Sequence, residues 1–158
     1  MKTNAIRMMF ALAIGAIFAV SFSSAFAFAP LQKSSGKNPL SGTTWQLVKF
    51  QGPDERTFSP EDRSKYTISF GNNGRVTVRV DCNRGSSTWK LGSADGELQF
   101  GSWSRTSAKC GPGSLHDQIV REGADVHKFD LKDGRLFLFG MPNGGYYELE
   151  PLPAGQKR

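Results

Sequence analysis

Hydrophobic and polar residues alternate along two neighbouring segments in the middle of the chain. In residues 66–70, Tyr, Ile and Phe alternate with Thr and Ser, and in residues 75–80 three valines alternate with Arg and Thr. A period of two is typical of a β-strand with one buried and one solvent-facing side. Asn72-Asn73-Gly74 separates the segments, and Asn-Gly supplies the positive φ angles of a tight turn. The pattern therefore predicts a hairpin over residues 66–80.

Similar short segments follow at hairpin spacing along the rest of the chain. They are separated by further turn signals, in which Gly follows Asp or Asn, at residues 94–96, 132–134 and 143–145. The other predicted strands are residues 43–50, 87–91, 97–104, 126–131, 135–139 and 146–150. Residues 136–139, Leu-Phe-Leu-Phe, are apolar on both faces, which predicts a strand that is central or covered on both sides.

Only one segment has a helical pattern. Ser114 can cap its start, the apolar residues Leu115, Ile119 and Val120 share a face, and Gly123 can end it. About eight short strands and one helix predict a mainly β fold, an antiparallel meander. Such a sheet must curl or be covered to hide its edges, so we expect a small β-barrel or half-barrel with the helix packed against one opening.

Residues 1–27 have the composition of a secretory signal peptide. Lys2 and Arg7 form a basic start, and residues 8–20 form a continuous apolar run. This run is too short for a membrane-spanning helix, which needs about 20 apolar residues, but it fits a signal-peptide core, which needs about 7–15. The small-x-small triplet at residues 25–27 then favours cleavage after Ala27, and an uncleaved anchor is the alternative. Without a cysteine at that site, we expect an exported, periplasmic or secreted protein that is not a lipoprotein and keeps no membrane span.

The rest of the chain, from residue 28 to residue 158, is long enough for one domain with a hydrophobic core. We divide the chain into a signal peptide (1–27), a flexible lead-in (28–39), one domain (40–151) and a basic tail (152–158). Cleavage removes two of the 20 basic residues and none of the 14 acids, which leaves a net charge of +4. This mild positive charge favours anionic surroundings without indicating nucleic acid as a partner.

The two cysteines, Cys82 and Cys110, both lie in the exported part. An oxidising compartment favours a structural disulfide between them, which would close the loop from residue 82 to residue 110. Two alternatives use the histidines. A zinc site would need His116 and His127 as further ligands, but neither lies at a familiar spacing from the cysteines. A Cys110–His116 nucleophile lacks any local signature. We therefore predict no metal and no catalytic residue.

Four segments occur in a distinctive order: GTTWQLV (42–48), YTISFGNNGRVTVRVDCNRG (66–85), LQFGSWSRTSAKC (98–110) and DGRLFLFG (133–140). They contain a D-C-N triplet at residues 81–83 and a T-x-x-x-C motif at residues 106–110. Over roughly residues 40–150 the chain resembles the META domain family, the family of the heat-shock protein HslJ. It departs from the usual pattern in one place, because Ser107-Ala108-Lys109 stands where members usually carry a Met-Ala pair before the cysteine.

The resemblance implies a lipocalin-like β-barrel with one helix, in agreement with the alternation pattern. It also implies a protein of the bacterial envelope, of a kind often linked to stress or drug tolerance, and it does not imply an enzyme. The family has no agreed biochemical activity, so the resemblance leaves the function open.

A candidate recognition rim consists of Asp81, Asn83 and Arg84. If the parity of the preceding valines continues, Cys82 points into the core and Asp81 points outward. Asn83 would then belong to a turn, Arg84 could pair with Asp81, and the next strand would begin at residue 87. This architectural interpretation accounts for every residue. The alternative is that the three polar side chains also bind a ligand or partner.

Aromatic residues give a second candidate surface, formed by Trp45, Trp89 and Trp103. Core packing is the default for such residues. The alternative is that they line a barrel mouth that holds a small apolar ligand.

Together these observations predict a non-catalytic, monomeric accessory protein of the envelope that binds a small ligand or an envelope protein. Two histidines and no paired-acid or triad pattern disfavour an enzyme, and no cofactor is expected. Two more specific hypotheses remain: a carrier that holds a small apolar ligand in the barrel mouth, and a periplasmic inhibitor of a cell-wall enzyme.

Overall fold

The computed structural model describes residues 38–122, 126–140 and 145–152, all within the unit Gly36–Arg158. The predicted signal peptide lies outside the described residues, as do most of the predicted lead-in and tail. No helix in the described part of the chain is long and apolar enough to cross a membrane.

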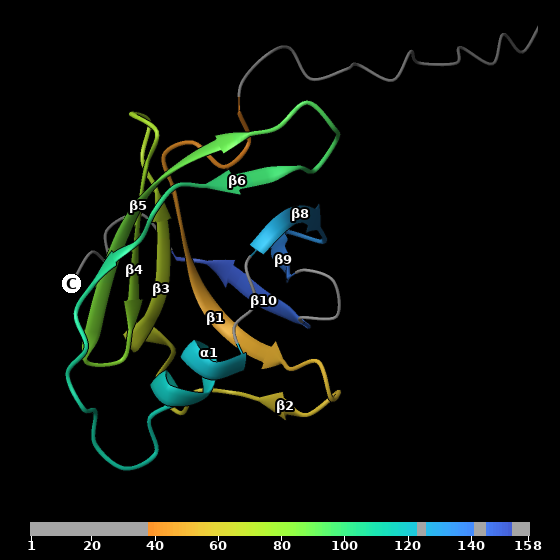
Figure 1. The fold of residues 1–158 in the computed structure, drawn as a ribbon. Helices are drawn as coiled ribbons and strands as arrows, with labels where there is room; N and C mark the ends of the chain where they lie inside the picture. The colour runs from red at the N-terminus through yellow and green to blue at the C-terminus, as the bar shows by residue number, and fades with distance from the viewer. Residues whose placement is uncertain (1–37, 123–125, 141–144, 153–158) are drawn as a thin grey trace, which may run out of the picture. The chain divides into compact units, whose positions relative to one another are not determined.

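The described residues form an antiparallel sheet, one α-helix and one turn of 3-10 helix (Figure 1). The elements are β1 (Thr43–Gln51), β2 (Thr57–Phe58), η1 (Arg63–Lys65), β3 (Tyr66–Phe70), β4 (Arg75–Val80), β5 (Asn83–Leu91), β6 (Leu98–Phe100), β7 (Ser104–Arg105), α1 (His116–Glu122), β8 (Val126–Lys132), β9 (Arg135–Gly140) and β10 (Tyr146–Pro151). The strand order is β6-β5-β4-β3-β1-β10-β9-β8, with β2 paired to β1 and β7 paired to β5.

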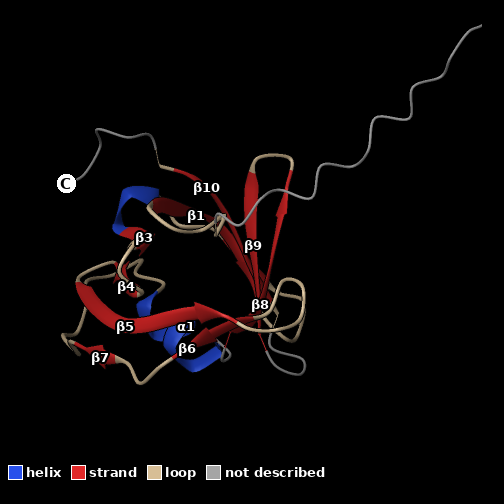
Figure 2. Cartoon of the chain, turned by 90° about the horizontal axis from the view of Figure 1, so that it is seen from above, coloured by secondary structure: helices blue, strands red, loops and turns tan. Residues whose placement is uncertain are grey.

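The sheet curls until its two end strands, β6 and β8, lie beside each other (Figure 2). A single bridge between Glu97 and Lys128 joins them, together with a hydrogen bond of 2.8 Å from the Phe129 amide to the Gly96 carbonyl. Curling in this way hides most of the backbone groups that an open edge would expose. The predicted fold, a mainly β barrel with one helix, is confirmed, and the barrel has one seam without a regular ladder of hydrogen bonds.

The predicted hairpin over residues 66–80 is confirmed as β3 and β4. Its register pairs Tyr66 with Val80, Ile68 with Val78 and Phe70 with Val76. Gly74 closes the turn with a φ of +74°, a conformation that glycine adopts without the steric cost of a Cβ atom. The local alternation therefore determined both the pairing and the face that is buried.

Two predicted strands differ from the structure. The predicted strand 97–104 is interrupted after Phe100. Between the pairs Trp89–Phe100 and Ser86–Ser104, this segment has three residues (101–103), whereas β5 has only two. One extra residue is a β-bulge, which locally disrupts pairing and bends the chain. In addition, β5 begins at Asn83 rather than at residue 87.

The barrel interior is densely packed toward the β3–β4 turn. Buried side chains there come from both halves of the sheet and include Leu40, Trp45, Phe70, Val76, Trp89, Leu98 and Leu136. Along β4 the interior side chains become less buried, from Val76 at 0% exposed to half-buried Val78 and Val80. The core therefore fills one end of the barrel more completely than the other.

On the outer face, Glu148 of β10 is a buried acid between two basic residues. Its carboxylate contacts Lys49 of β1 at 3.2 Å and is hydrogen-bonded by Arg135 of β9. Burial alone would raise the pKa of Glu148, but the hydrogen bonds from Arg135 and Lys49 outweigh it, so the pKa lies below its ordinary value. The charged carboxylate therefore links three neighbouring strands.

We predict that Glu148→Gln destabilises the protein in a pH-dependent way. Because the pKa is lowered by folding, the carboxylate stabilises the fold above the pKa of the unfolded chain, about 4.3. This contribution is lost as the pH falls through the lower folded pKa. Urea unfolding at pH 7 should show a loss of about 1–3 kcal/mol in the variant, and the difference should shrink toward pH 3. Glu61→Gln, at an exposed position, is the control, and a difference that is equal at every pH would contradict the prediction.

Candidate functional site

Asn83, the first residue of β5, holds a distant segment of the chain against the barrel. Its side chain is only 3% exposed. The amide nitrogen donates to the Ala108 carbonyl at 2.8 Å, and the amide oxygen accepts from the Ala108 amide and from the Thr106 hydroxyl, each at 2.8 Å. The backbone of Arg84 adds a hydrogen bond in each direction with Thr106. We call this set of contacts the Asn83 clamp.

The predicted disulfide between Cys82 and Cys110 is present beside the Asn83 clamp. The expectation that Cys82 points into the core is wrong, because Cys82 is exposed. Asp81 and Cys82 form a two-residue turn between the paired residues Val80 and Asn83, and Asp81 has a φ of +56°. This turn ends the alternation of the strand, so Asn83 rather than Cys82 takes the inward position.

The three residues of the predicted rim lie in different environments. Asn83 is buried in the clamp, and the Asp81 carboxylate lies 3.7 Å from Lys65 rather than pairing with Arg84. The Arg84 guanidinium instead donates to the backbone carbonyl of Asp81 at 3.1 Å, and so does that of Arg79. The structure therefore does not combine the three side chains into one rim, and it places Arg84 opposite Arg79, which was not part of the predicted rim.

The three tryptophans also lie in different environments. Trp45 and Trp89 are 7% and 6% exposed and donate their indole N–H groups within the core region, to Thr43 and to the Gly71 carbonyl. Trp103 lies between β6 and β7, is 40% exposed and packs against Phe100 with ring centroids 5.3 Å apart. Of the predicted aromatic surface, only Trp103 is accessible.

A cavity of about 600 Å³ lies inside the barrel where α1 packs against it. Most of its lining is apolar and comes from the inner faces of the strands, from the segment after β6 and from α1; it includes Leu47, Ile68, Val78, Val80, Phe100, Trp103, Ile119, Val120, Val126, Leu138, Tyr147 and Leu149. In Figure 1, α1 lies at the opposite end of the barrel from the β5–β6 turn. We call this space the mouth cavity.

Two hydrogen bonds fix the start of α1, one to the barrel and one within the helix cap. The Leu115 amide donates to the Tyr66 hydroxyl at 2.9 Å, and the His116 amide donates to the Ser114 hydroxyl at 3.1 Å, so Ser114 caps the helix as predicted. Gly85 of β5, which also lines the mouth cavity, has no side chain and so leaves space in it. A Cβ at this position would lie 2.9 Å from Val78 and 3.6 Å from Trp103.

Two side chains give the mouth cavity its accessible edge, and a third gives it a polar group. Trp103 and Val120 are large hydrophobic residues that are 40% and 44% exposed. Tyr147 stacks on Phe50 at 4.8 Å, and burial raises the pKa of its phenol well above its ordinary value, so the phenol stays neutral. Its hydroxyl has no hydrogen-bond partner among the described residues.

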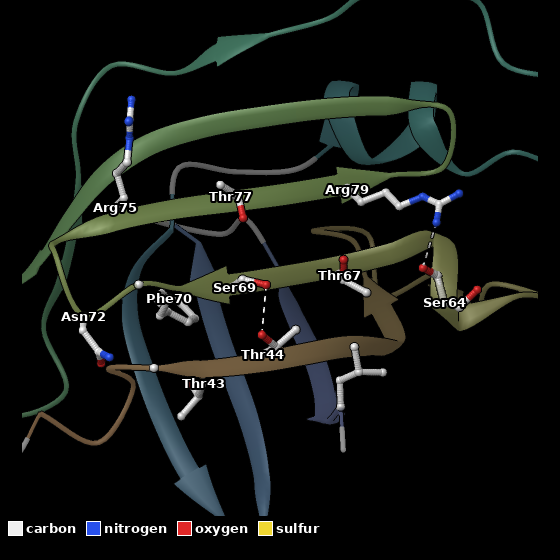
Figure 3. Close-up of a pocket in the computed structure, with 13 residues that line it drawn as sticks. Thr43, Thr44, Ser64, Thr67, Ser69, Phe70, Asn72, Arg75, Thr77 and Arg79 are labelled. Carbon is white, nitrogen blue, oxygen red and sulfur yellow. Dashed lines mark hydrogen bonds between the residues drawn. The ribbon is translucent and has the colours of Figure 1, made fainter. Parts of the chain in front are cut away.

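Two adjoining polar hollows lie on the outer face of the same strands. The first, of about 670 Å³, lies over β1, β3 and β4 (Figure 3), and the second, of about 560 Å³, extends over β5 and β7. They share Thr67, Ser69, Thr77 and Arg79. The alternation pattern assigned these residues to the solvent-facing side, but only the strand order shows which of them are neighbours.

The chemistry of the remaining candidates is limited. Cys110 is in a disulfide, so it has no thiol to act as a nucleophile with His116. The His116 ring instead lies 2.9 Å from the Asp117 carboxylate. Within the described ranges, no group of three or more His, Cys, Asp or Glu side chains could hold a metal ion.

The family model of the META domain matches residues 38–149. The chain belongs to the META domain family. The D-C-N and T-x-x-x-C motifs of this META protein supply the disulfide, the clamp residue Asn83 and its partner Thr106. These distinctive motifs therefore have an architectural role.

Two solution structures share the fold at low sequence identity. That of a protein from Burkholderia xenovorans is 17% identical, with a TM-score of 0.57 over 78% of this chain and 96% of that one. The other is 22% identical, with a TM-score of 0.52 over 70% and 90% of the two chains. A DUF4847 family protein from Bacteroides vulgatus is 15% identical, with a TM-score of 0.49 over 71% and 94%. Among curated proteins, none matches this chain.

We predict that Asn83→Ala destabilises the protein by about 2–4 kcal/mol. The substitution removes three hydrogen bonds that the buried Asn83 amide makes with Ala108 and Thr106, and each such bond contributes about 0.5–1.5 kcal/mol. Chemical denaturation measures the loss, with Gln99→Ala, which removes an exposed amide, as the control. Equal stability of the two variants would show that the clamp is not important for folding.

We also predict that the Cys82→Ser, Cys110→Ser double variant loses about 3.5 kcal/mol of stability. This value follows from the loop of 28 residues that the disulfide closes, in the chain-entropy model. Thiol titration of the denatured, exported wild-type protein should find no free thiol. Two titratable thiols would contradict the structural disulfide.

Proposed function

We propose that this META protein is an exported, non-catalytic binding protein of the bacterial envelope that holds a small apolar ligand in its mouth cavity. The observation that supports this proposal is the cavity itself. Its volume of about 600 Å³ falls in the range of about 300–1,000 Å³ that is usual for small-molecule sites. Export is supported by the composition of residues 1–27 and by the disulfide, which persists in an oxidising compartment.

The lining of the mouth cavity indicates the kind of ligand. Val78, Val80 and Ile119 are only partly buried although they pack on the core, so an apolar ligand could cover their remaining exposed surface. The neutral hydroxyl of Tyr147 adds a hydrogen-bonding group among these apolar residues. These features favour a ligand that is largely hydrophobic and carries a polar group.

A non-catalytic role fits the chemistry of the mouth cavity. The titratable side chains among its lining residues are Tyr66, Arg79, Arg84, Arg105, His116 and Tyr147. Tyr66 accepts a hydrogen bond that holds α1, and Tyr147 is neutral. Such a set favours binding over acid–base catalysis, which needs a positioned donor and acceptor with suitable pKa values.

We predict that Val120→Asp weakens binding of the fluorescent apolar probe N-phenyl-1-naphthylamine by about tenfold or more. A carboxylate at the edge of the mouth cavity must be desolvated when an apolar molecule covers it. Because Val120 is 44% exposed, the substitution should change the melting temperature little. Probe titration followed by fluorescence measures the affinity.

Leu131→Asp is the matched control, because Leu131 is 40% exposed but does not line the mouth cavity. The control should bind the probe like the wild-type protein. Equal loss in both variants, or no probe binding by the wild-type protein, would contradict the proposed site. Mass spectrometry of the native protein isolated from the envelope should in addition reveal a co-purified apolar molecule.

A further inference from the structure

A row of hydroxyl side chains crosses the outer face of the barrel. Cross-strand pairing joins Thr44 to Ser69, Ser69 to Thr77, Thr77 to Ser86 and Ser86 to Ser104. Five strands, β1, β3, β4, β5 and β7, thus each contribute one hydroxyl in register. Neighbouring strands lie about 4.8 Å apart, so the row extends over roughly 19 Å. We call it the hydroxyl row.

Most of the hydroxyl row is available to a ligand. Thr44 donates to Ser69 at 3.0 Å (Figure 3). The hydroxyls of Thr77, Ser86 and Ser104 have no hydrogen-bond partner in the part of the chain that the structure describes. Because a hydroxyl both donates and accepts, the row presents a regular series of groups that can pair with other hydroxyls.

Arginines lie on both sides of the hydroxyl row. Arg75 lies at one side, and Arg79 and Arg84 lie at the other, directly opposite each other on β4 and β5. Like charges in directly opposed positions destabilise a sheet. This arrangement therefore has an electrostatic cost that a bound anion would remove.

The hydrogen bonds of Arg79 and Arg84 go to neutral backbone groups and not to acids. Arg79 and Arg84 donate to backbone carbonyls, both of them to that of Asp81, and neither makes an ion pair with a described residue. Among the described residues that line the two outer hollows, none is Asp or Glu. The Asp62 carboxylate, near one edge, accepts hydrogen bonds from Ser64, which lower the pKa of that carboxyl, and the charges of Lys65 and Arg79 lower it further.

We propose that this outer face binds an extended anionic glycan. Guanidinium groups pair with carboxylate or sulfate oxygens through charge-assisted hydrogen bonds, and the hydroxyl row pairs with sugar hydroxyls between them. The two hollows run together across the row, so they can accommodate an elongated chain rather than a single small anion.

Two other anionic partners fit this face less well. Binding of single-stranded nucleic acid relies on aromatic side chains for base stacking, and the only aromatic residue in the described lining, Phe70, is 1% exposed. A membrane surface requires exposed apolar side chains that enter the lipid. Trp103, Val120 and Leu131, which are large and exposed, do not line the outer hollows.

The hydroxyl row and the mouth cavity lie on opposite faces of the sheet, although Arg79, Arg84 and Arg105 line both the mouth cavity and the second outer hollow. The hydroxyl and arginine side chains of β3 and β4 point outward, whereas Ile68 and Val78 of the same strands point into the barrel. The two proposals remain distinguishable, because Val120 lines neither outer hollow and Thr77 does not line the mouth cavity, so Val120→Asp tests only the first and Thr77→Val only the second.

The test is calorimetric titration of the protein with oligogalacturonate, a linear polyuronate, and with neutral dextran oligosaccharides. We expect oligogalacturonate to bind and dextran not to bind. Arg79→Gln and Arg84→Gln should each weaken the affinity about tenfold, which is typical of losing a hydrogen bond to a charged group. Thr77→Val, which keeps the shape and β-propensity of the side chain, should weaken it about threefold.

Lys132→Gln is the control, because it removes one exposed positive charge on β8 outside both outer hollows. It should bind oligogalacturonate like the wild-type protein. An equal loss in Lys132→Gln and Arg79→Gln would overturn the proposal, since it would indicate only a general attraction to positive charge. It would also be overturned if an oligonucleotide or anionic phospholipid vesicles bound more tightly than oligogalacturonate, or if Thr77→Val had no effect.

Discussion

The buried side chain of Asn83 is the interaction on which the mouth of this barrel depends. The segment between β6 and α1 is long, and only two of its residues, those of β7, form a strand in the sheet. Such a segment gains little from backbone pairing, and a buried amide with all its partners in place is one of the few ways to fix it. By binding Ala108 and Thr106, Asn83 fixes the middle of the segment that runs from Trp103 to α1.

The disulfide and the Asn83 clamp act on the same junction by different physical means. The disulfide restricts the unfolded chain, whereas the clamp satisfies polar groups that burial would otherwise leave unpaired. Cys82 remains exposed because its sulfur joins the loop from outside the core. The distinctive motifs of the META family thus hold the chain together at one point, and the surfaces available for binding lie to either side of it.

The strands next to this junction have two different faces. Toward the inside, the packing loosens along β4 from Val76 to Val80, and this leaves the mouth cavity. Toward the outside, the same strands carry threonines, serines and arginines in register. A single sheet can therefore support an apolar site and a polar site, because successive side chains of a strand point to opposite faces.

The sequence by itself determined those elements that depend on local signals. The alternation at residues 66–80 and the Asn-Gly turn predicted the hairpin, and Ser114 predicted the helix cap, because turns, caps and alternation depend on residues close together in the chain. Most strand boundaries and the barrel class followed in the same way, and the pairing of Cys82 with Cys110 followed because the chain has only two cysteines. Tertiary structure decided the rest. The inward position of Asn83, the outward position of Cys82 and the break after Phe100 depend on a two-residue turn and a bulge, and each of these shifts the parity on which a sequence interpretation relies. The meeting of Arg79 with Arg84, and the alignment of hydroxyls from five strands, depend on strand order, which no local pattern contains.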